Sequence, residues 1–259
     1  MNLPGFRSRL RSTAALALLP LLALTACGSG DTDAAAVGAQ ASPAPTDDPI
    51  AAVREVDAVA ALLPADVRQA GTLRVGSSIG FPPGAYYPNG SDKAPAGQDI
   101  DIADAVAKVL GVKLERQDAS FETILPALGS GKYDFGTGNF GVTTERLKTI
   151  DFVTYINDGQ GFVVKKGNTA LGTKVTGIMS TINGLRYQAA QPASQTTFLG
   201  EFHRLDVGFA FKKRSPLTEA FQAAVNELIE DGTYGRILKK WGTSASAIDA
   251  SRVNPPEHR

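Results

Sequence analysis

The chain has 259 residues, enough for one large domain or two small lobes around a hydrophobic core. Its 26 basic and 26 acidic side chains balance, so the bulk charge favours neither nucleic acid nor an anionic membrane face as a partner. The sequence contains no repeat of fixed period, which argues against solenoids and propellers.

Residues 1–27 have the organisation of an export signal. Three arginines precede an apolar run from Ala14 to Leu24, which is short for a membrane span. The run ends in Leu24-Thr25-Ala26-Cys27, which resembles a bacterial lipobox. This resemblance implies cleavage before Cys27 and acyl chains such as palmitate attached there, a stable anchor when two or more are present. The alternative is an ordinary signal peptide with an incidental cysteine.

Glycine, serine, alanine, proline, threonine and aspartate dominate residues 28–49, which predicts a flexible linker. Helical periodicity interrupted at Pro64 predicts one or two short helices over residues 50–70. At the other end, residues 243–259 are predicted to form a disordered tail.

Between these ends, strand-like and helix-like segments alternate. Strands are predicted at residues 72–76, 112–116, 133–138, 150–153, 161–166, 174–179 and 207–212. Helices are predicted at residues 99–110, from the cap Ser120 to Gly129, from near Thr143, at 184–191, from the cap Ser215 to Asp231, and around 234–241. Strands separated by helices imply parallel pairing through right-handed crossovers, and hence an α/β fold.

Short motifs along this core occur in a recognisable order. They are Gly71-Thr-Leu-Arg-Val-Gly76, Gly97-Gln-Asp-Ile-Asp-Ile102, Ile124-Leu-Pro-Ala-Leu128, Gly131-Lys-Tyr-Asp134, Thr143-Thr-Glu-Arg146, Asp151-Phe152, and Asp231-Gly-Thr-Tyr234 with Trp241. Together they resemble the extracellular solute-binding proteins of polar amino-acid importers, solute-binding protein family 3. The resemblance covers residues 50–242.

The resemblance implies a two-lobe α/β fold of the type 2 periplasmic-binding-protein kind. Lobe one would comprise residues 50–155 with a return of 213–242, and residues 156–212 would form lobe two. The family has further elements where this chain joins residue 166 almost directly to 175, so lobe two is predicted to be truncated. The implied partners are a small solute clamped between the lobes and a membrane permease of the ABC type. We expect a monomer anchored by lipid to the outer face of the cell membrane, in an extracellular or periplasmic location.

A ligand in a parallel α/β sheet lies beyond the carboxyl ends of the strands. The loop 139–143 follows a predicted strand there, and its N–H groups before a helix favour an anion. Arg146 can add a two-pronged grip on a carboxylate, and the resemblance assigns it the α-carboxylate of the solute. The alternative is a surface arginine paired with Glu145 or Asp151.

The resemblance places further residues around the solute. Phe81 and Phe121 match aromatic walls, although core packing is an equal alternative for each. Asn139 and Gly141 match positions that hydrogen-bond the solute, and Asn139 can equally satisfy its own loop. In lobe two the family binds the α-amine with an aspartate. This chain offers the neutral Thr181 and Asn183 instead.

Other polar residues favour structural roles. Asp99 and Asp101, spaced by two at a helix start, suit capping and dipole complementation better than acid–base chemistry. The histidines, His203 and His258, form no metal motif, so neither a metal nor a cofactor is expected. We therefore expect a binding protein and not an enzyme. Two alternatives remain, a truncated relic that no longer binds and an exported enzyme like the cyclohexadienyl dehydratases.

Overall fold

A computed structural model describes residues 44–89, 94–168 and 178–257, which belong to one unit of the chain, Gln40–Arg259. The strands are β1 Thr72–Ser77, β2 Lys113–Asp118, β3 Phe135–Gly141, β4 Ile150–Lys165, β5 Ile178–Thr181 and β6 Thr196–Lys212. The α-helices are α1 Asp57–Ala60, α2 Ala65–Ala70, α3 Gln98–Val109, α4 Phe121–Gly129, α5 Ile182–Ala190, α6 Thr218–Glu230 and α7 Thr233–Trp241. Short 3-10 turns are η1 Arg146–Lys148 and η2 Ser244–Ser246. The predicted signal peptide, Cys27 and residues 28–43 of the linker lie outside the described residues.

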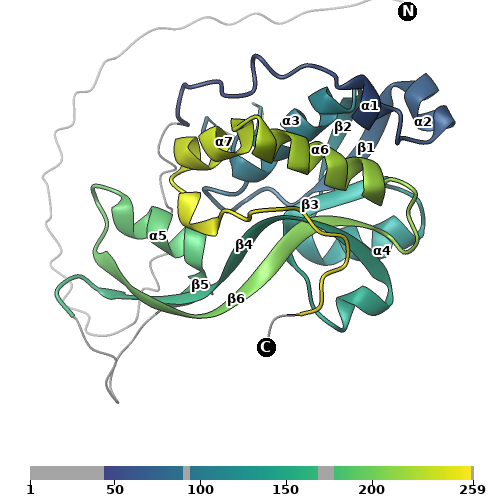
Figure 1. Cartoon of the computed structure of the whole chain (residues 1–259). Coiled ribbons are helices and arrows are strands. Elements are labelled where there is room, and N and C mark those ends of the chain that lie inside the picture. Colours follow the sequence, from purple (N-terminus) through teal and green to yellow (C-terminus); the bar gives the residue numbers. More distant parts are fainter. Residues whose placement is uncertain (1–43, 90–93, 169–177, 258–259) are drawn as a thin grey trace, which may run out of the picture. The chain divides into compact units, whose positions relative to one another are not determined.

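The strands form one mixed sheet in the order β2-β1-β3-β6-β4-β5 (Figure 1). β1 pairs in parallel with β2 and β3, whereas β6 runs antiparallel to β3 and β4, and β5 antiparallel to β4. The prediction of parallel crossovers therefore holds for β1, β2 and β3 and is wrong for the rest. β4, with 16 residues, runs continuously through two segments predicted as separate short strands, and β6, with 17 residues, extends the strand predicted at 207–212 back to Thr196.

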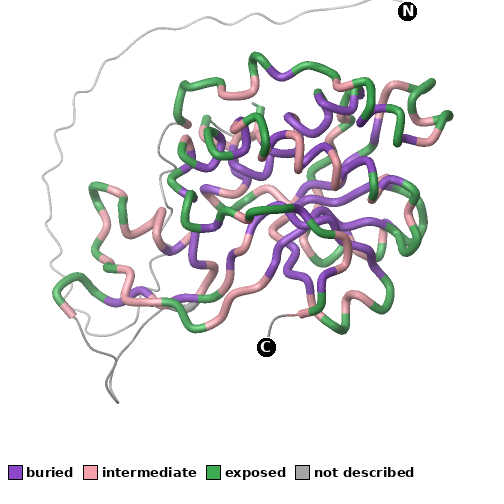
Figure 2. The backbone as a smooth tube through the Cα atoms, viewed as in Figure 1, coloured by how far each residue is buried: buried purple, intermediate pink, exposed green. Residues whose placement is uncertain are grey.

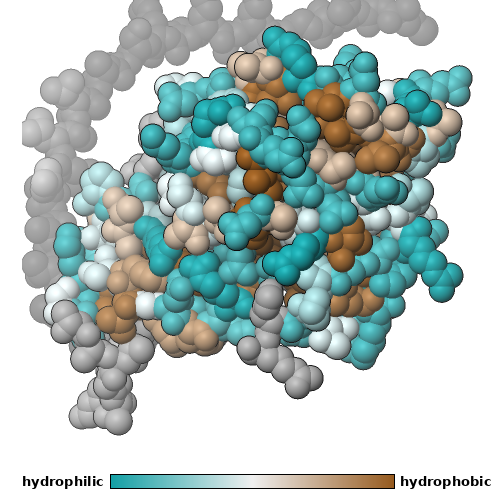
Figure 3. Space-filling view, viewed as in Figure 1, coloured by the Kyte–Doolittle hydropathy of each residue, from teal (hydrophilic) through white to brown (hydrophobic). Residues whose placement is uncertain are grey.

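Two apolar clusters hold the helices against opposite faces of the sheet. The larger one joins α1, α3, α6 and α7 to the strands, and its buried side chains include Ile102, Val106 and Phe221 from the predicted helix stripes. On the other face, Ile124 and Leu128 of α4 pack against neighbouring strands. Figure 2 shows buried residues concentrated along the strands and the sheet-facing sides of the helices. Figure 3 shows hydrophilic groups over much of the visible face, with hydrophobic groups in several patches.

The C-terminal segment is ordered along one edge of β4, where a disordered tail was predicted for residues 243–259. Val253 forms a bridge with Val153, and Thr154 N–H donates to the carbonyl of Arg252 over 3.0 Å. Ser251 is buried and its hydroxyl donates to the carbonyl of Thr154 over 2.6 Å. These bonds cover an edge that would otherwise present unpaired backbone groups to solvent.

Helix ends differ in detail from the predictions. Ser120 occupies the N-cap position of α4 but makes no side-chain cap bond, and α6 begins at Thr218 rather than directly after Ser215. The helix predicted from Thr143 is only the 3-10 turn η1. Of the strand predicted at 174–179, residues 174–177 lie outside the described residues. Among the described helices, none combines the length and apolarity that crossing a membrane requires.

Candidate functional site

A cavity of about 350 Å³ lies at the carboxyl ends of β1 and β3, where a ligand site was expected. Its walls come from the loop after β1, the first turns of α3 and α4, and the start of α5 beyond the sheet. β4 contributes to the wall near the middle of its length, through Asp158. A cavity of this size suits a small organic molecule.

Four of the six predicted contact residues line this cavity, namely Phe81, Phe121, Asn139 and Thr181. Gly141 and Arg146 are not part of the lining. Both lie close to the lining residue Phe121. The Arg146 guanidinium is 5.5 Å from the centre of the Phe121 ring, and it donates a hydrogen bond to the Gly141 carbonyl over 2.8 Å.

The two phenylalanines have different environments. Phe81 lies in the loop after β1 and is 76% exposed, which argues against core packing. Phe121 is the first residue of α4 and is half-buried, with its ring stacked on Phe140 at 4.8 Å between centres. Phe81 is therefore an open aromatic wall of the cavity, and Phe121 a wall supported by the core.

The guanidinium of Arg146 has no ion pair with any carboxylate in the part of the chain that the structure describes. Glu145 pairs with Lys148, and Asp151 pairs with Lys213 over 2.8 Å. The alternative of an arginine held by Glu145 or Asp151 is therefore excluded. Burial lowers the pKa of Arg146 from its usual value, because removing water disfavours the charged form. A half-buried cation without a counter-charge is well suited to receive an anion.

Asn139 and Thr181 line the cavity from different elements, β3 and the N-cap of α5. Asn139 adopts the left-handed backbone conformation, with φ of 56°, and its side chain hydrogen-bonds to Asp158. Asparagine tolerates this conformation better than most residues. Thr181 is the N-cap of α5 and its hydroxyl accepts from Gly184 N–H over 3.2 Å. The Asn139 side chain thus contacts β4, whereas the alternative was a bond within its own loop.

Two buried carboxylates in the cavity wall were not predicted as site residues. Asp99 in α3 and Asp158 in β4 are each 2% exposed. Burial raises the pKa of Asp99 to a net value of about 6; bonds from Gln98 and Tyr155 oppose this shift and the charge of Asp158 adds to it. Burial also raises the pKa of Asp158, against bonds from the N–H groups of Gly159 and Asn183. The helix-capping role predicted for Asp99 does not explain this buried position.

Asp101, predicted to act like Asp99, has a different and structural role. Its carboxylate accepts from Lys240 Nζ and from Trp241 Nε1, both over 2.7 Å. It therefore joins α3 to α7 and takes no part in the cavity. Asp99 and Asp101 have different surroundings because residues two positions apart in a helix lie on different faces of it.

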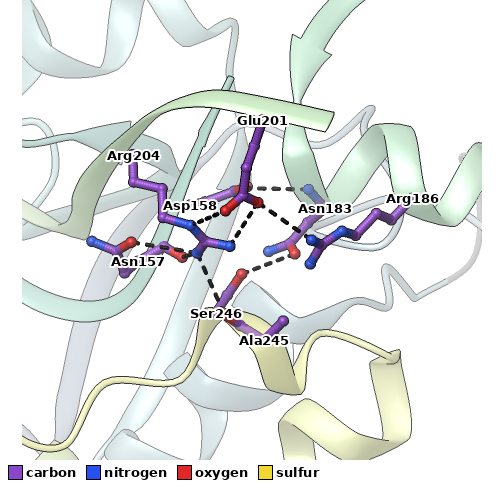
Figure 4. Close-up of polar contacts among 8 residues, drawn as sticks. All are labelled: Asn157, Asp158, Asn183, Arg186, Glu201, Arg204, Ala245 and Ser246. Atoms are coloured by element: carbon purple, nitrogen blue, oxygen red, sulfur yellow. Dashed lines mark hydrogen bonds and ion pairs between the residues drawn. The ribbon is translucent and has the colours of Figure 1, made fainter. Parts of the chain in front are cut away.

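A polar cluster behind the cavity fixes Asp158 and Asn183 in place (Figure 4). Asn183 N–H donates to Asp158 over 3.2 Å, and Ser246 Oγ donates to Asn183 Oδ1 over 2.9 Å. Arg204 binds Glu201 and also donates to the carbonyls of Asn157 and Ala245. The C-terminal segment thus connects β4, β6 and α5 where the two long strands leave the main part of the sheet.

Several buried polar atoms of the lining have no hydrogen-bond partner among the described residues. They are Gln98 Oε1, Asn139 Oδ1 and Asn183 Nδ2. Gln98 is 2% exposed and Asn183 6% exposed. Because an unsatisfied buried polar atom is unfavourable by about 1–3 kcal/mol, such atoms in a cavity wall are available for a ligand.

The sequence gives only weak indications that Asp158, Gln98 and Asp99 belong to the site. Asp158 lies between two segments that were predicted as separate strands, so its place inside a single strand was not apparent. Gln98 and Asp99 belong to a recognised motif, but the pattern does not reveal which polar side chain faces inward. No cluster of three or more histidine, cysteine or acidic side chains suited to a metal occurs among the residues that the structure covers.

Comparisons with known proteins agree with this architecture. A family profile described as bacterial extracellular solute-binding proteins, family 3, matches residues 73–244. The chain is 26% identical to the arginine-binding protein ArgT of Corynebacterium glutamicum, over 77% of this chain and 83% of that one. It is also 26% identical to the glutamine-binding protein GlnH of Bacillus subtilis, over 89% of this chain and 96% of that one.

Solved structures show the same fold. An ancestral arginine-binding protein bound to arginine superposes with a TM-score of 0.58 at 30% identity, covering 66% of this chain and 98% of that one. These relatives are binding proteins, as expected for a chain that is not an enzyme. The α/β fold of the type 2 periplasmic-binding proteins and the match over residues 73–244 lead to one conclusion: the chain belongs to the bacterial extracellular solute-binding proteins of family 3.

Proposed function

We propose that this protein captures a small amino acid outside the cell and delivers it to an ABC permease in the membrane. The observation that carries the proposal is the cavity of about 350 Å³ between the loop after β1, the starts of α3 and α4, the middle of β4 and the start of α5. The relatives named for binding arginine and glutamine support an amino acid as the solute.

The proposed lobes follow the sequence prediction, with residues 50–155 and 213–242 in lobe one and 156–212 in lobe two. α5 contacts lobe one, since Tyr187 packs against Tyr86 with 6.3 Å between ring centres. Bending of β4 and β6 between the lobes would open and close the cavity. Solute binding would favour the closed form, which the permease recognises, and the protein would act as a monomer.

We assign the contacts as follows. Arg146 binds the carboxylate of the solute, and the lack of a described carboxylate partner leaves its guanidinium free to do so. Phe81 and Phe121 flank the apolar part of the solute. Asn139, Gly141 and Thr181 contribute hydrogen bonds in addition to those that they make within the protein.

The finer features of the sequence prediction complete the proposal. Cleavage before Cys27 and lipidation of its sulfur would anchor the protein to the outer face of the membrane, with residues 28–49 as the linker. Lobe two would be shorter than in the family, because within the described residues it consists of the far parts of β4 and β6 with β5 and α5.

Calorimetric titration of the purified protein with a panel of amino acids, polyamines and organic acids tests the function. Saturable binding of an amino acid with one-to-one stoichiometry is the expected result. Silence toward every compound, with a poorly cooperative melting transition, would instead indicate a relic whose short second lobe no longer binds.

A further inference from the structure

We infer that Asp99 and Asp158 form a subsite for a cationic group of the solute, and that this solute carries a positive side group in addition to its amino group. The inference rests on the proposed function and specifies the class of amino acid that the site takes.

The first observation is the uncompensated charge of the two carboxylates. Both are 2% exposed, both line the cavity, and the charge of one affects the ionisation of the other. Neither forms an ion pair with a lysine or arginine within the described part of the chain. Buried charges in proteins are normally paired, because an isolated one is strongly unfavourable. A cation from outside would supply the missing partner.

An independent observation comes from the neutral polar atoms nearby. Gln98 is 2% exposed and lines the cavity, and its Oε1 has no donor among the described residues. Asn139 Oδ1 is also an acceptor without a donor. The wall therefore presents an excess of acceptors, which matches a group rich in N–H donors such as a guanidinium or an ammonium.

A count of the charges in the site then favours a cationic over a neutral amino acid as the solute. The neighbourhood of the cavity holds two buried carboxylates and one unpaired guanidinium, that of Arg146. A neutral amino acid would bring one ammonium and one carboxylate, and one aspartate would remain unpaired. A cationic amino acid brings two positive groups and one carboxylate, so both buried aspartates and Arg146 find a partner, whereas Glu122 of the lining is exposed to solvent. Asn183 Nδ2 offers the carboxylate a further donor.

L-Arginine and L-citrulline provide the test, because they have nearly the same shape and differ in the charge of the side group. Calorimetric titration of the full chain in detergent should give at least about tenfold tighter binding of arginine, the value of one charge-assisted bond. Asp99→Asn and Asp158→Asn should each reduce this ratio severalfold. The matched control Asp104→Asn changes an acid of the same helix that pairs with Arg116 outside the cavity, and it should leave the ratio unchanged.

Equal or tighter binding of citrulline would overturn the inference while leaving the proposed function intact. A ratio unchanged in both cavity variants would overturn it as well. Should a variant fail to fold, the ratio for the unaltered protein still decides. Binding of neither compound, nor of any other amino acid, would instead count against the proposed function itself.

Discussion

At the scale of single residues, the site combines one half-buried cation with two buried anions. Arg146 stands beside the Phe121 wall without a described counter-charge, whereas Asp99 and Asp158 lie within the cavity lining. Such an arrangement is unfavourable in the empty protein, and a bound solute of complementary charge would relieve it. The ligand-free site thus holds electrostatic free energy that becomes available on binding.

Arg146→Ala should weaken amino-acid binding by about tenfold or more, because it removes a charge-assisted hydrogen bond to the carboxylate. Calorimetric titration measures the affinity. Arg68→Ala, which changes an exposed arginine of α2, is the matched control and should bind normally. Unaltered affinity of Arg146→Ala would remove this residue from the site.

Asp99→Asn should stabilise the ligand-free protein at pH 7, on the order of 2 kcal/mol, because the variant carries no buried charge there. The groups facing this carboxyl are Gln98 of α3, Tyr155 and Asp158 of β4, and the backbone of Asn139. Its pKa in the folded state, about 6, exceeds the unfolded value, so the wild type gains stability relative to the variant as pH falls from about 6 toward 4. Urea unfolding of both proteins at a series of pH values measures the difference, and a variant less stable than the wild type at pH 7 would contradict the account.

The sequence predicts four residues of the cavity lining but not its two buried carboxylates. Phe81, Phe121, Asn139 and Thr181 line the cavity as the resemblance implies. Asp158 was missed because its burial arises from the pairing of β4 with β6, a contact between segments far apart in the chain. Asp99 was taken for a capping residue, since the sequence does not show that the loop after β1 folds over it.

At the scale of elements, β4 and β6 decide the architecture. Each begins or ends in the main part of the sheet and extends beyond it, where β5 and α5 complete the smaller part (Figure 1). Alternation of strands and helices predicts β1, β2 and β3 correctly. It fails for β4 because Asn157, Asp158 and Gly159 favour turns locally, while pairing with β6 along the whole length keeps the backbone extended.

The C-terminal segment, predicted to be disordered, has a place in the site through Ser246. Its hydroxyl binds Asn183 Oδ1, which leaves Nδ2 of that amide toward the cavity lining. The segment is polar and has little periodicity, so its order depends on bonds to β4 that the local sequence does not reveal.

Ser246→Ala should reduce the affinity for the amino acid by about threefold to tenfold, because the Asn183 amide loses the bond that fixes its orientation. Ser244→Ala, in the same turn but exposed, is the control and should have no effect. The affinities come from titration at one pH. Equal affinities for the two variants would show that the orientation of Asn183 does not depend on this bond.

At the scale of the whole molecule, the proposed function combines a binding domain with a membrane anchor. A lipid on Cys27 would hold the protein at the membrane surface, and residues 28–49 would let the domain reach a permease. Capture and delivery then occur close to the same membrane.

Cys27→Ser should release the protein from the membrane, because it removes the only site for the thioether-linked lipid. Cell fractionation with antibody detection measures the distribution, and mass spectrometry of the N-terminal peptide identifies the modification. A Ser variant that stays in the membrane fraction, or a wild-type peptide without lipid, would contradict the proposed anchor.

The central claim is that an amino acid occupies the cavity between α3, α4, β4 and α5. A crystal structure of the protein with the amino acid that it binds most tightly tests this claim most directly. We predict electron density for the solute in this cavity, in contact with Asp158 and beside the Phe121 ring. Density for the solute elsewhere, for instance in the larger hollow of about 610 Å³ beside α2, with this cavity empty, would contradict the account.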